Sequence, residues 1–86
     1  MWALNWPDIL LDWLADYYVA AAPDLRQRMA AGVEALNARL RSDPLDVGES
    51  RERGFRIAFA PGLVVLFRVD VAARKVAVAD VRPYGR

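Results

Sequence analysis

The chain has 86 residues, of which 56% are hydrophobic and 27% are charged, and its formal net charge at pH 7 is +1. This length can fill one small core and this composition differs from that of disordered chains, so we expect a single domain over residues 1–86. Because cysteine and histidine are absent, disulfides, thiolate or imidazole metal sites and Ser-His or Cys-His catalysis are excluded. No cofactor and no metal are expected.

The charge is distributed unevenly along the chain. Residues 1–50 carry four basic and eight acidic side chains, whereas residues 51–86 carry eight basic and three acidic ones. This asymmetry suggests that the C-terminal half faces something anionic. The start has neither the basic nor the apolar region of a signal peptide, and no apolar run approaches the ~20 residues of a membrane span. We therefore expect a cytoplasmic protein.

The first half predicts a strand and two helices. Residues 2–6 are short and aromatic, and indicate a strand that ends at Pro7. Apolar residues then recur at helical spacing up to Ala21, and again from Leu25 to Leu40 after the break at Ala22-Pro23. Since the connection between the helices is very short, we expect them to pack as antiparallel neighbours. Residues 42–53 have the composition of a loop.

The second half predicts three strands, at 54–60, 63–70 and 75–82, joined by turns at Pro61-Gly62 and around residues 72–73. The predicted fold class is therefore α+β: an N-terminal strand and an antiparallel helical hairpin packed on a small antiparallel sheet, in the order β-α-α-β-β-β. One face of this sheet lies under the helices and the other is open.

Strand alternation assigns the residues to the two faces. It predicts that Arg56 and Arg68 project from the open face, together with Ala58, Val64 and Leu66. The residues that alternate with them face the helices: Phe55, Ile57, Phe59, Leu63, Val65, Phe67 and Val69. Arg82 and Tyr84 leave the last strand nearby, and Glu49, Arg51 and Arg53 come from the loop that enters the sheet. Such a basic face suits phosphate or nucleic acid, although arginines on a solvated sheet face also discourage aggregation.

Two other groups of residues have structural explanations. Asp8, Asp12 and Asp16 lie on one face of the first helix, where stacked carboxylates point outward and cannot converge on one ion. The three tryptophans and the Tyr17-Tyr18 pair are most simply core residues, with docking to a partner as the alternative.

The order and spacing of several short motifs resemble the RelE/ParE superfamily of bacterial type II toxins. The second helix ends in an Asp43-Pro44 loop, followed by Gly48-Glu49-Ser50 and Gly54-Phe55-Arg56-Ile57. Residues 63–69, LVVLFRV, resemble the family's "..V.YRV" strand, and residues 74–82, RKVAVADVR, resemble its closing "R.V.V..V".

The resemblance implies a toxin that a co-encoded antitoxin keeps inactive. RelE-like members are ribosome-dependent mRNA endonucleases, and for them the resemblance implies catalytic roles for Glu49, Arg56, Arg68, Arg82 and Tyr84. The nucleic acid would be bound by the surrounding basic residues: Arg51, Arg53, Arg74, Lys75 and Arg86. ParE-like members instead bind and poison DNA gyrase without being nucleases.

The chain departs from the nuclease pattern at two places. Leu63-Val64-Val65 stands where RelE-like nucleases often carry a catalytic arginine, and Ala58 stands where a second basic residue would help. Two hypotheses follow. One is a ribosome-dependent mRNA interferase, whose partners are the ribosome and mRNA. The other is a non-enzymatic toxin, either a ParE-like gyrase inhibitor or an inactive member that acts only as a binding module.

Overall fold

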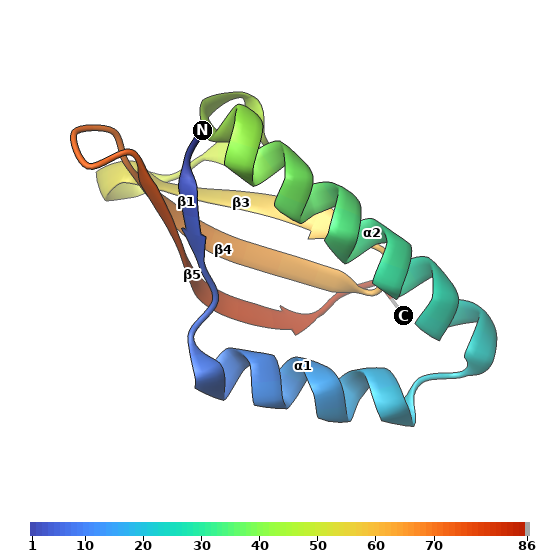
Figure 1. Cartoon of the computed structure of the whole chain (residues 1–86). Helices are drawn as coiled ribbons and strands as arrows, with labels where there is room; N and C mark the ends of the chain where they lie inside the picture. Colours follow the sequence, from blue (N-terminus) through green and yellow to red (C-terminus); the bar gives the residue numbers. More distant parts are fainter. Residues whose placement is uncertain (86) are drawn as a thin grey trace.

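The computed structural model describes residues 1–85, in which two helices pack on one sheet (Figure 1). The predicted α+β arrangement is confirmed, and one short additional strand precedes the three C-terminal ones. The strands are β1 (Ala3–Asn5), β2 (Glu49–Ser50), β3 (Phe55–Ala60), β4 (Leu63–Asp70) and β5 (Lys75–Pro83). The helices are α1 (Asp8–Ala20) and α2 (Pro23–Ser42), and the short 3-10 turns η1 (Pro44–Asp46) and η2 (Glu52–Gly54) flank β2.

The sheet has the strand order β1-β5-β4-β3-β2. The pairs β2–β3, β3–β4 and β4–β5 are antiparallel, as expected for strands joined by short turns. The N-terminal strand β1 is the exception because it pairs with β5 in parallel, with Leu4 opposite Val76. The sheet is therefore mixed rather than wholly antiparallel.

The core lies between the helices and one face of the sheet. β4 contributes Leu63, Val65 and Phe67, each fully buried, and thus confirms the predicted alternation of that strand. Helix α2 buries Met29, Leu36 and Leu40, whereas α1 packs half-buried side chains against the same cluster: Leu10, Trp13, Leu14, Tyr17 and Ala21, the last just beyond the helix. The tryptophans and Tyr17 belong to this core, as their simplest interpretation predicted, but the same prediction is wrong for Tyr18, which is exposed.

The face assignment predicted for β3 is wrong by one residue. Ala58 is 4% exposed while its neighbour Phe59 is 50% exposed. The register places Arg56 opposite Phe67 and Ala58 opposite Val65, so these residues share the helix-covered face. Phe55, Ile57 and Phe59 consequently lie on the open face, and Arg56 does not.

Close backbone packing explains why β3 turns small residues inward. A Cβ at Gly32 of α2 would collide with the ring of Pro61 and lie 3.6 Å from the Ala60 Cβ. At Gly48, which has a φ of +66°, a Cβ would collide with the carbonyl oxygen of Ile57 and lie 3.1 Å from the Ala58 Cβ. Phenylalanine side chains at positions 58 and 60 would have no space beneath this helix and loop.

An irregularity in β5 changes the alternation of the last strand. Leu66 pairs with Asp80 and Phe67 with Val78, so Ala79 is an extra residue between them. The buried residues of β5 are therefore Val76, Val78 and Val81. This β-bulge brings Asp80 and Arg82 onto the open face, where an unbroken alternation would have turned them toward the core.

The helices diverge from the short connection at residues 21–22, and both cover the same face of the sheet (Figure 1). The hairpin 70–75, between β4 and β5, projects at the opposite end of the molecule from this connection (Figure 1). Neither helix described within residues 1–85 is long and apolar enough to cross a bilayer.

Candidate functional site on the open face of the sheet

The open face has an apolar centre. Across β3, β4 and β5, the register aligns two neighbouring rows of side chains: Ile57–Leu66–Asp80 and Phe59–Val64–Arg82. Ile57, Val64 and Leu66 are half-buried, and they alternate with Ala58 and Val65, which are buried under the helices. The sequence analysis predicted Val64 and Leu66 on this face. It missed Ile57 and Phe59, because it assigned the alternating residues of β3 to the wrong faces.

Arg56 stabilises the loop before β3 instead of reaching the open face. Its Nε donates to the Val47 carbonyl oxygen at 2.9 Å and its Nη2 to the Gly48 carbonyl oxygen at 3.2 Å. The remaining nitrogen, Nη1, donates to Ser50 Oγ at 3.1 Å. The planar donor fork of the guanidinium is thus used to hold residues 47–50 against the sheet edge.

The other predicted catalytic residues with charge are on the open face but far apart. Arg68 of β4 lies opposite Ala77, and Arg82 of β5 lies opposite Val64 of β4. Because Val64 and Arg68 are four residues apart, the two arginines are separated by about 13 Å along the strand. Glu49 pairs with Ile57 on the edge strand β2, three strand spacings or roughly 14 Å from β5. Acid-base catalysis and phosphorane stabilisation require groups within about 3 Å of the reacting atoms.

Each of these charged groups also has a neighbour of its own. Arg82 Nε lies 2.7 Å from Asp80 Oδ2, and Arg51 Nη1 lies 3.3 Å from Glu49 Oε1. The Arg68 guanidinium carbon lies 5.5 Å from the ring centroid of Phe55, in a cation–π contact. The arrangement brings the arginines onto one face, but it does not gather them around one phosphate.

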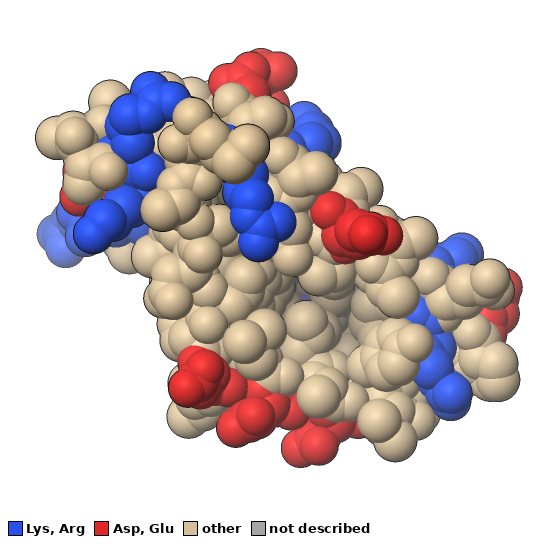
Figure 2. Space-filling view, in the orientation of Figure 1, with Lys and Arg blue, Asp and Glu red and all other residues tan. Residues whose placement is uncertain are grey.

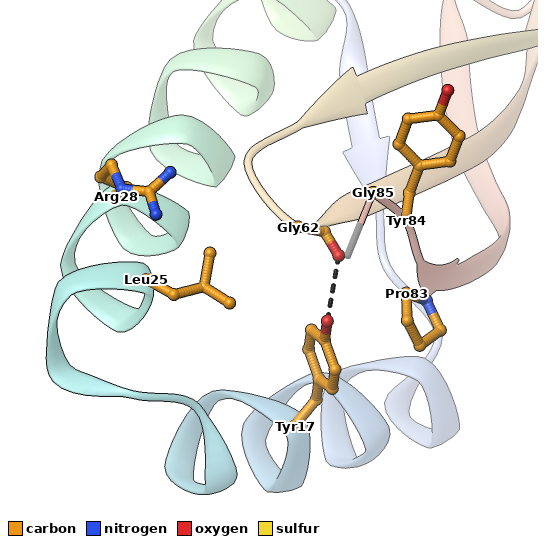
Figure 3. Close-up of a pocket in the computed structure, with 7 residues that line it drawn as sticks. All are labelled: Tyr17, Leu25, Arg28, Gly62, Pro83, Tyr84 and Gly85. Atoms are coloured by element: carbon orange, nitrogen blue, oxygen red, sulfur yellow. Dashed lines mark hydrogen bonds between the residues drawn. The ribbon is translucent and has the colours of Figure 1, made fainter.

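Tyr84 lies just beyond β5, where its ring contacts Phe59 with centroids 4.7 Å apart. It borders a hollow of about 370 Å³ at the end of the sheet, together with Tyr17, Leu25 and Arg28 from the helical side (Figure 3). Tyr17 lines one side of this hollow, and its hydroxyl donates to the Gly62 carbonyl oxygen at 3.1 Å (Figure 3). Tyr84 therefore extends the apolar surface that begins at Phe59.

The residues predicted to bind nucleic acid gather at the other end of the sheet. Arg51 precedes η2 and Arg53 lies within it, whereas Arg74 and Lys75 belong to the hairpin between β4 and β5; all four side chains are exposed. Arg86 lies outside the described residues. Among residues 1–85, no group of three or more acidic side chains has the arrangement of a metal site.

A second apolar surface, between the two helices, escaped the sequence analysis. Leu11, Leu14, Ala15 and Tyr18 of α1 face Met29, Ala30 and Val33 of α2 across a groove of about 250 Å³. Carboxylates flank it on both sides, with Asp12 and Asp16 on the outer face of α1 and Glu34 directly after Val33 on α2. Figure 2 shows this tan hollow between acidic atoms. The spacing of Leu11, Ala15 and Tyr18, a second stripe on α1, was the available signal.

These features define a small α+β fold with two solvent-exposed apolar surfaces. No family model matches the sequence, and no curated protein matches it. Solved structures do share the fold. A chain of the toxin–antitoxin complex RelBE2 from Mycobacterium tuberculosis is 20% identical, with a TM-score of 0.67 over 99% of this chain and 93% of that one.

Two further structures agree. A chain of the chromosomal ParDE toxin–antitoxin system from P. aeruginosa is 18% identical, with a TM-score of 0.68 over 99% of this chain and 98% of that one. The isolated E. coli RelE toxin is 15% identical, with a TM-score of 0.63 over 100% of this chain and 87% of that one. The chain therefore has the RelE/ParE-like fold.

Proposed function

We propose that this protein is the toxin of a type II toxin–antitoxin pair and that it acts by binding a protein target, not by cleaving RNA. The observation that supports binding of a protein target is the apolar centre of the open face, where Ile57, Val64 and Leu66 lie between Arg68 and Arg82. A surface of this kind suits a protein partner, because exposed apolar patches with charged rims are typical of interfaces.

The position of Arg56 supports the same proposal. In a nuclease this residue would face the scissile phosphate, yet all its guanidinium nitrogens donate to the 47–50 loop. Glu49 lies too far from Arg82 for the two to act on one bond. The fold shared with RelE and ParE proteins supports the toxin part of the proposal, and ParE-like gyrase inhibition is the first protein target to test.

Growth of cells that express this chain inducibly tests the proposal. We expect growth arrest with intact mRNA by primer extension, and DNA breaks that depend on gyrase if gyrase is the target. The variant Phe59→Glu places a charge on the open face at a half-exposed position and should relieve the arrest. The matched control Ala38→Glu, which adds the same charge at an exposed position of α2 away from the open face, should arrest growth as the parent does.

Two outcomes would contradict the proposal. Ribosome-dependent cuts in mRNA that disappear in the double variant Arg68→Ala/Arg82→Ala would establish the nuclease hypothesis instead. Absence of arrest from folded, expressed protein would mean that the chain shares the fold of these toxins without their action.

The groove between α1 and α2 is the proposed site for the antitoxin. Its apolar floor and acidic rims fit an amphipathic helix with basic flanks. Co-expression of the cognate antitoxin should restore growth. The variant Ala15→Arg fills the groove and brings positive charge to its rim, so cells that carry it should stay arrested despite the antitoxin. Rescue of this variant equal to that of the parent would place the antitoxin elsewhere.

A further inference from the structure

The two helices differ in how much of each is buried. Helix α2 has three buried side chains, Met29, Leu36 and Leu40, whereas α1 has none. The apolar residues of α1 that meet the core are half-buried, and every buried member of the core cluster among residues 1–85 lies outside α1. Separation of α1 from the rest would therefore expose much less apolar surface than unfolding of the whole domain, and it would cost less free energy.

The sequence of α1 also gives this helix little stability of its own. It has 13 residues, a length at which an isolated helix is marginal in water. Asp8, Asp12 and Asp16 are spaced by four residues, so neighbouring carboxylates repel one another. No basic residue lies in the last turn of α1, where a cation would be favourable. Helix α2 differs on both counts, because Arg28 pairs with Asp24 at the same spacing and two arginines lie in its last turn.

The polar contacts that hold α1 in place come from Tyr17 and Arg26. The Tyr17 hydroxyl donates to the Gly62 carbonyl oxygen at 3.1 Å (Figure 3). At the end of the helix, Arg26 Nη2 donates to the Ala21 carbonyl oxygen at 3.0 Å, and the guanidinium carbon lies 5.8 Å from the ring centroid of Tyr18. Arg26 Nε is buried and has no hydrogen-bond partner among residues 1–85. Because a buried donor without an acceptor costs free energy, the contact at this end of α1 is incompletely satisfied.

The segments on both sides of α1 are held more firmly than the helix itself. Before α1, the strand β1 pairs with β5, and Trp6 Nε1 donates to Asn37 Oδ1 of α2 at 2.9 Å in a partly buried contact. After α1, Pro23 begins the well-buried helix α2. Opening is therefore confined to residues 7–22. It is an unfolding of the helix between two fixed ends, and not a rotation of the whole N-terminal segment.

The groove between the helices depends on the position of α1, because α1 forms one of its walls. Leu11, Leu14 and Tyr18 line that wall, opposite Met29 and Val33 of α2. When α1 is open, the groove is absent. A molecule that occupies the groove therefore binds only the closed state, and it stabilises that state by its binding free energy.

We infer that α1 opens as a separate unit while the sheet and α2 stay folded, and that a partner in the groove acts by holding α1 closed. The opening follows from the burial, charges and contacts of α1 and does not depend on the proposed toxin action. The role of the partner rests on the antitoxin site proposed above. The apparent affinity for this partner is weakened in proportion to the fraction of closed molecules, so changes that stabilise α1 tighten binding.

Native-state hydrogen exchange of the purified chain, followed by NMR, tests the opening. We expect the hydrogen-bonded amides of α1 to exchange about tenfold faster, or more, than the amides of α2 and β4. Tyr17→Phe removes the hydrogen bond to Gly62 and should speed exchange in α1 about fivefold, without an effect on α2 or β4. Asp12→Lys replaces repulsion from Asp8 and Asp16 with attraction and should slow exchange in α1 roughly two- to fivefold.

Asp46→Lys is the matched control for Asp12→Lys, because it makes the same change of charge at an exposed position outside α1. It should leave exchange in α1 unchanged. Equal exchange rates in α1, α2 and β4 of the parent would mean that α1 opens only when the whole domain unfolds, and would overturn the inference. Variants of Tyr17 and Asp12 that shift all three elements equally would overturn it for the same reason.

The same measurement on the complex with the cognate antitoxin tests the role of the partner. Exchange in α1 should slow by a larger factor than exchange in β4, because the partner binds only molecules in which α1 is closed. Fast exchange in α1 that the antitoxin leaves unchanged would overturn this role and place the antitoxin outside the groove. The opening of α1 and the proposed toxin action would both stand after that result, since each has its own test.

Discussion

Neighbouring residues of β4 lie on two faces of the sheet with different roles. Leu63, Val65 and Phe67 are fully buried under the helices, whereas Val64 and Leu66 are only partly covered by their own sheet neighbours. The covered face has backbone contacts so close that glycine and alanine are required at Gly48 and Ala58. The open face has no such constraint, so its residues are free to be selected for binding. This difference is the reason for assigning function to the open face.

The largest expected difference in stability is between variants of two phenylalanines, Phe67 in the core and Phe59 on the open face. Phe67→Ala should cost about 3–5 kcal/mol of unfolding free energy, since it leaves a cavity in the core. That loss approaches the whole stability of a small domain, so the variant should be largely unfolded. Phe59→Ala should cost less than about 1 kcal/mol, because the ring is half exposed and its aromatic contact is with Tyr84. Urea denaturation followed by tryptophan fluorescence measures both.

Phe67→Leu keeps this comparison measurable if Phe67→Ala does not fold. It retains most of the apolar volume and should still be less stable than Phe59→Ala. The reverse order of stabilities would mean that the open face is covered in solution and would contradict its role as a free binding surface.

Much of the architecture could be predicted from the sequence because it depends on local signals. Helical spacing, the break at Ala22-Pro23 and the Pro61-Gly62 turn determine the order of the elements, which is confirmed. The alternation of β4 was also readable, because its two charged residues, Arg68 and Asp70, both fall on outward positions.

The alternation of β3 could not be read in the same way. One face carries Arg56 with alanines at positions 58 and 60, and the other carries large apolar residues at 55, 57 and 59. Size alone favours the large residues as core, but the close approach of α2 at Gly32 and of the loop at Gly48 reverses the choice. These contacts join residues far apart in sequence, and periodicity contains no information about them. The predicted position of Arg56 failed for this reason.

Arg56 and Arg68, which the sequence analysis placed on the same face, should differ less in their effects on stability. Arg56→Ala should cost about 1–2 kcal/mol, because the carbonyl groups of Val47 and Gly48 lose their donors. Arg68→Ala should cost about 0.5 kcal/mol, the worth of an exposed cation–π contact. Urea denaturation measures the difference, and limited proteolysis should show faster cleavage within residues 45–54 only for Arg56→Ala. Equal protease sensitivity of the two variants would mean that Arg56 does not hold the loop.

The smallest and most direct test exchanges one methyl group for a hydroxyl at two adjacent positions of β4. Val65 is fully buried, so the hydroxyl of Val65→Thr would lie in the apolar core and should cost about 1–2 kcal/mol. Val64 lies on the open face, where water reaches the new group, so Val64→Thr should change stability by less than about 0.5 kcal/mol. Threonine matches valine in shape and suits a strand equally well, which removes cavity and propensity effects from the comparison. Urea midpoints of the two variants therefore report the accessibility of each face to solvent. A similar loss in both would mean that a second layer, such as another copy of the chain, covers the open face in solution.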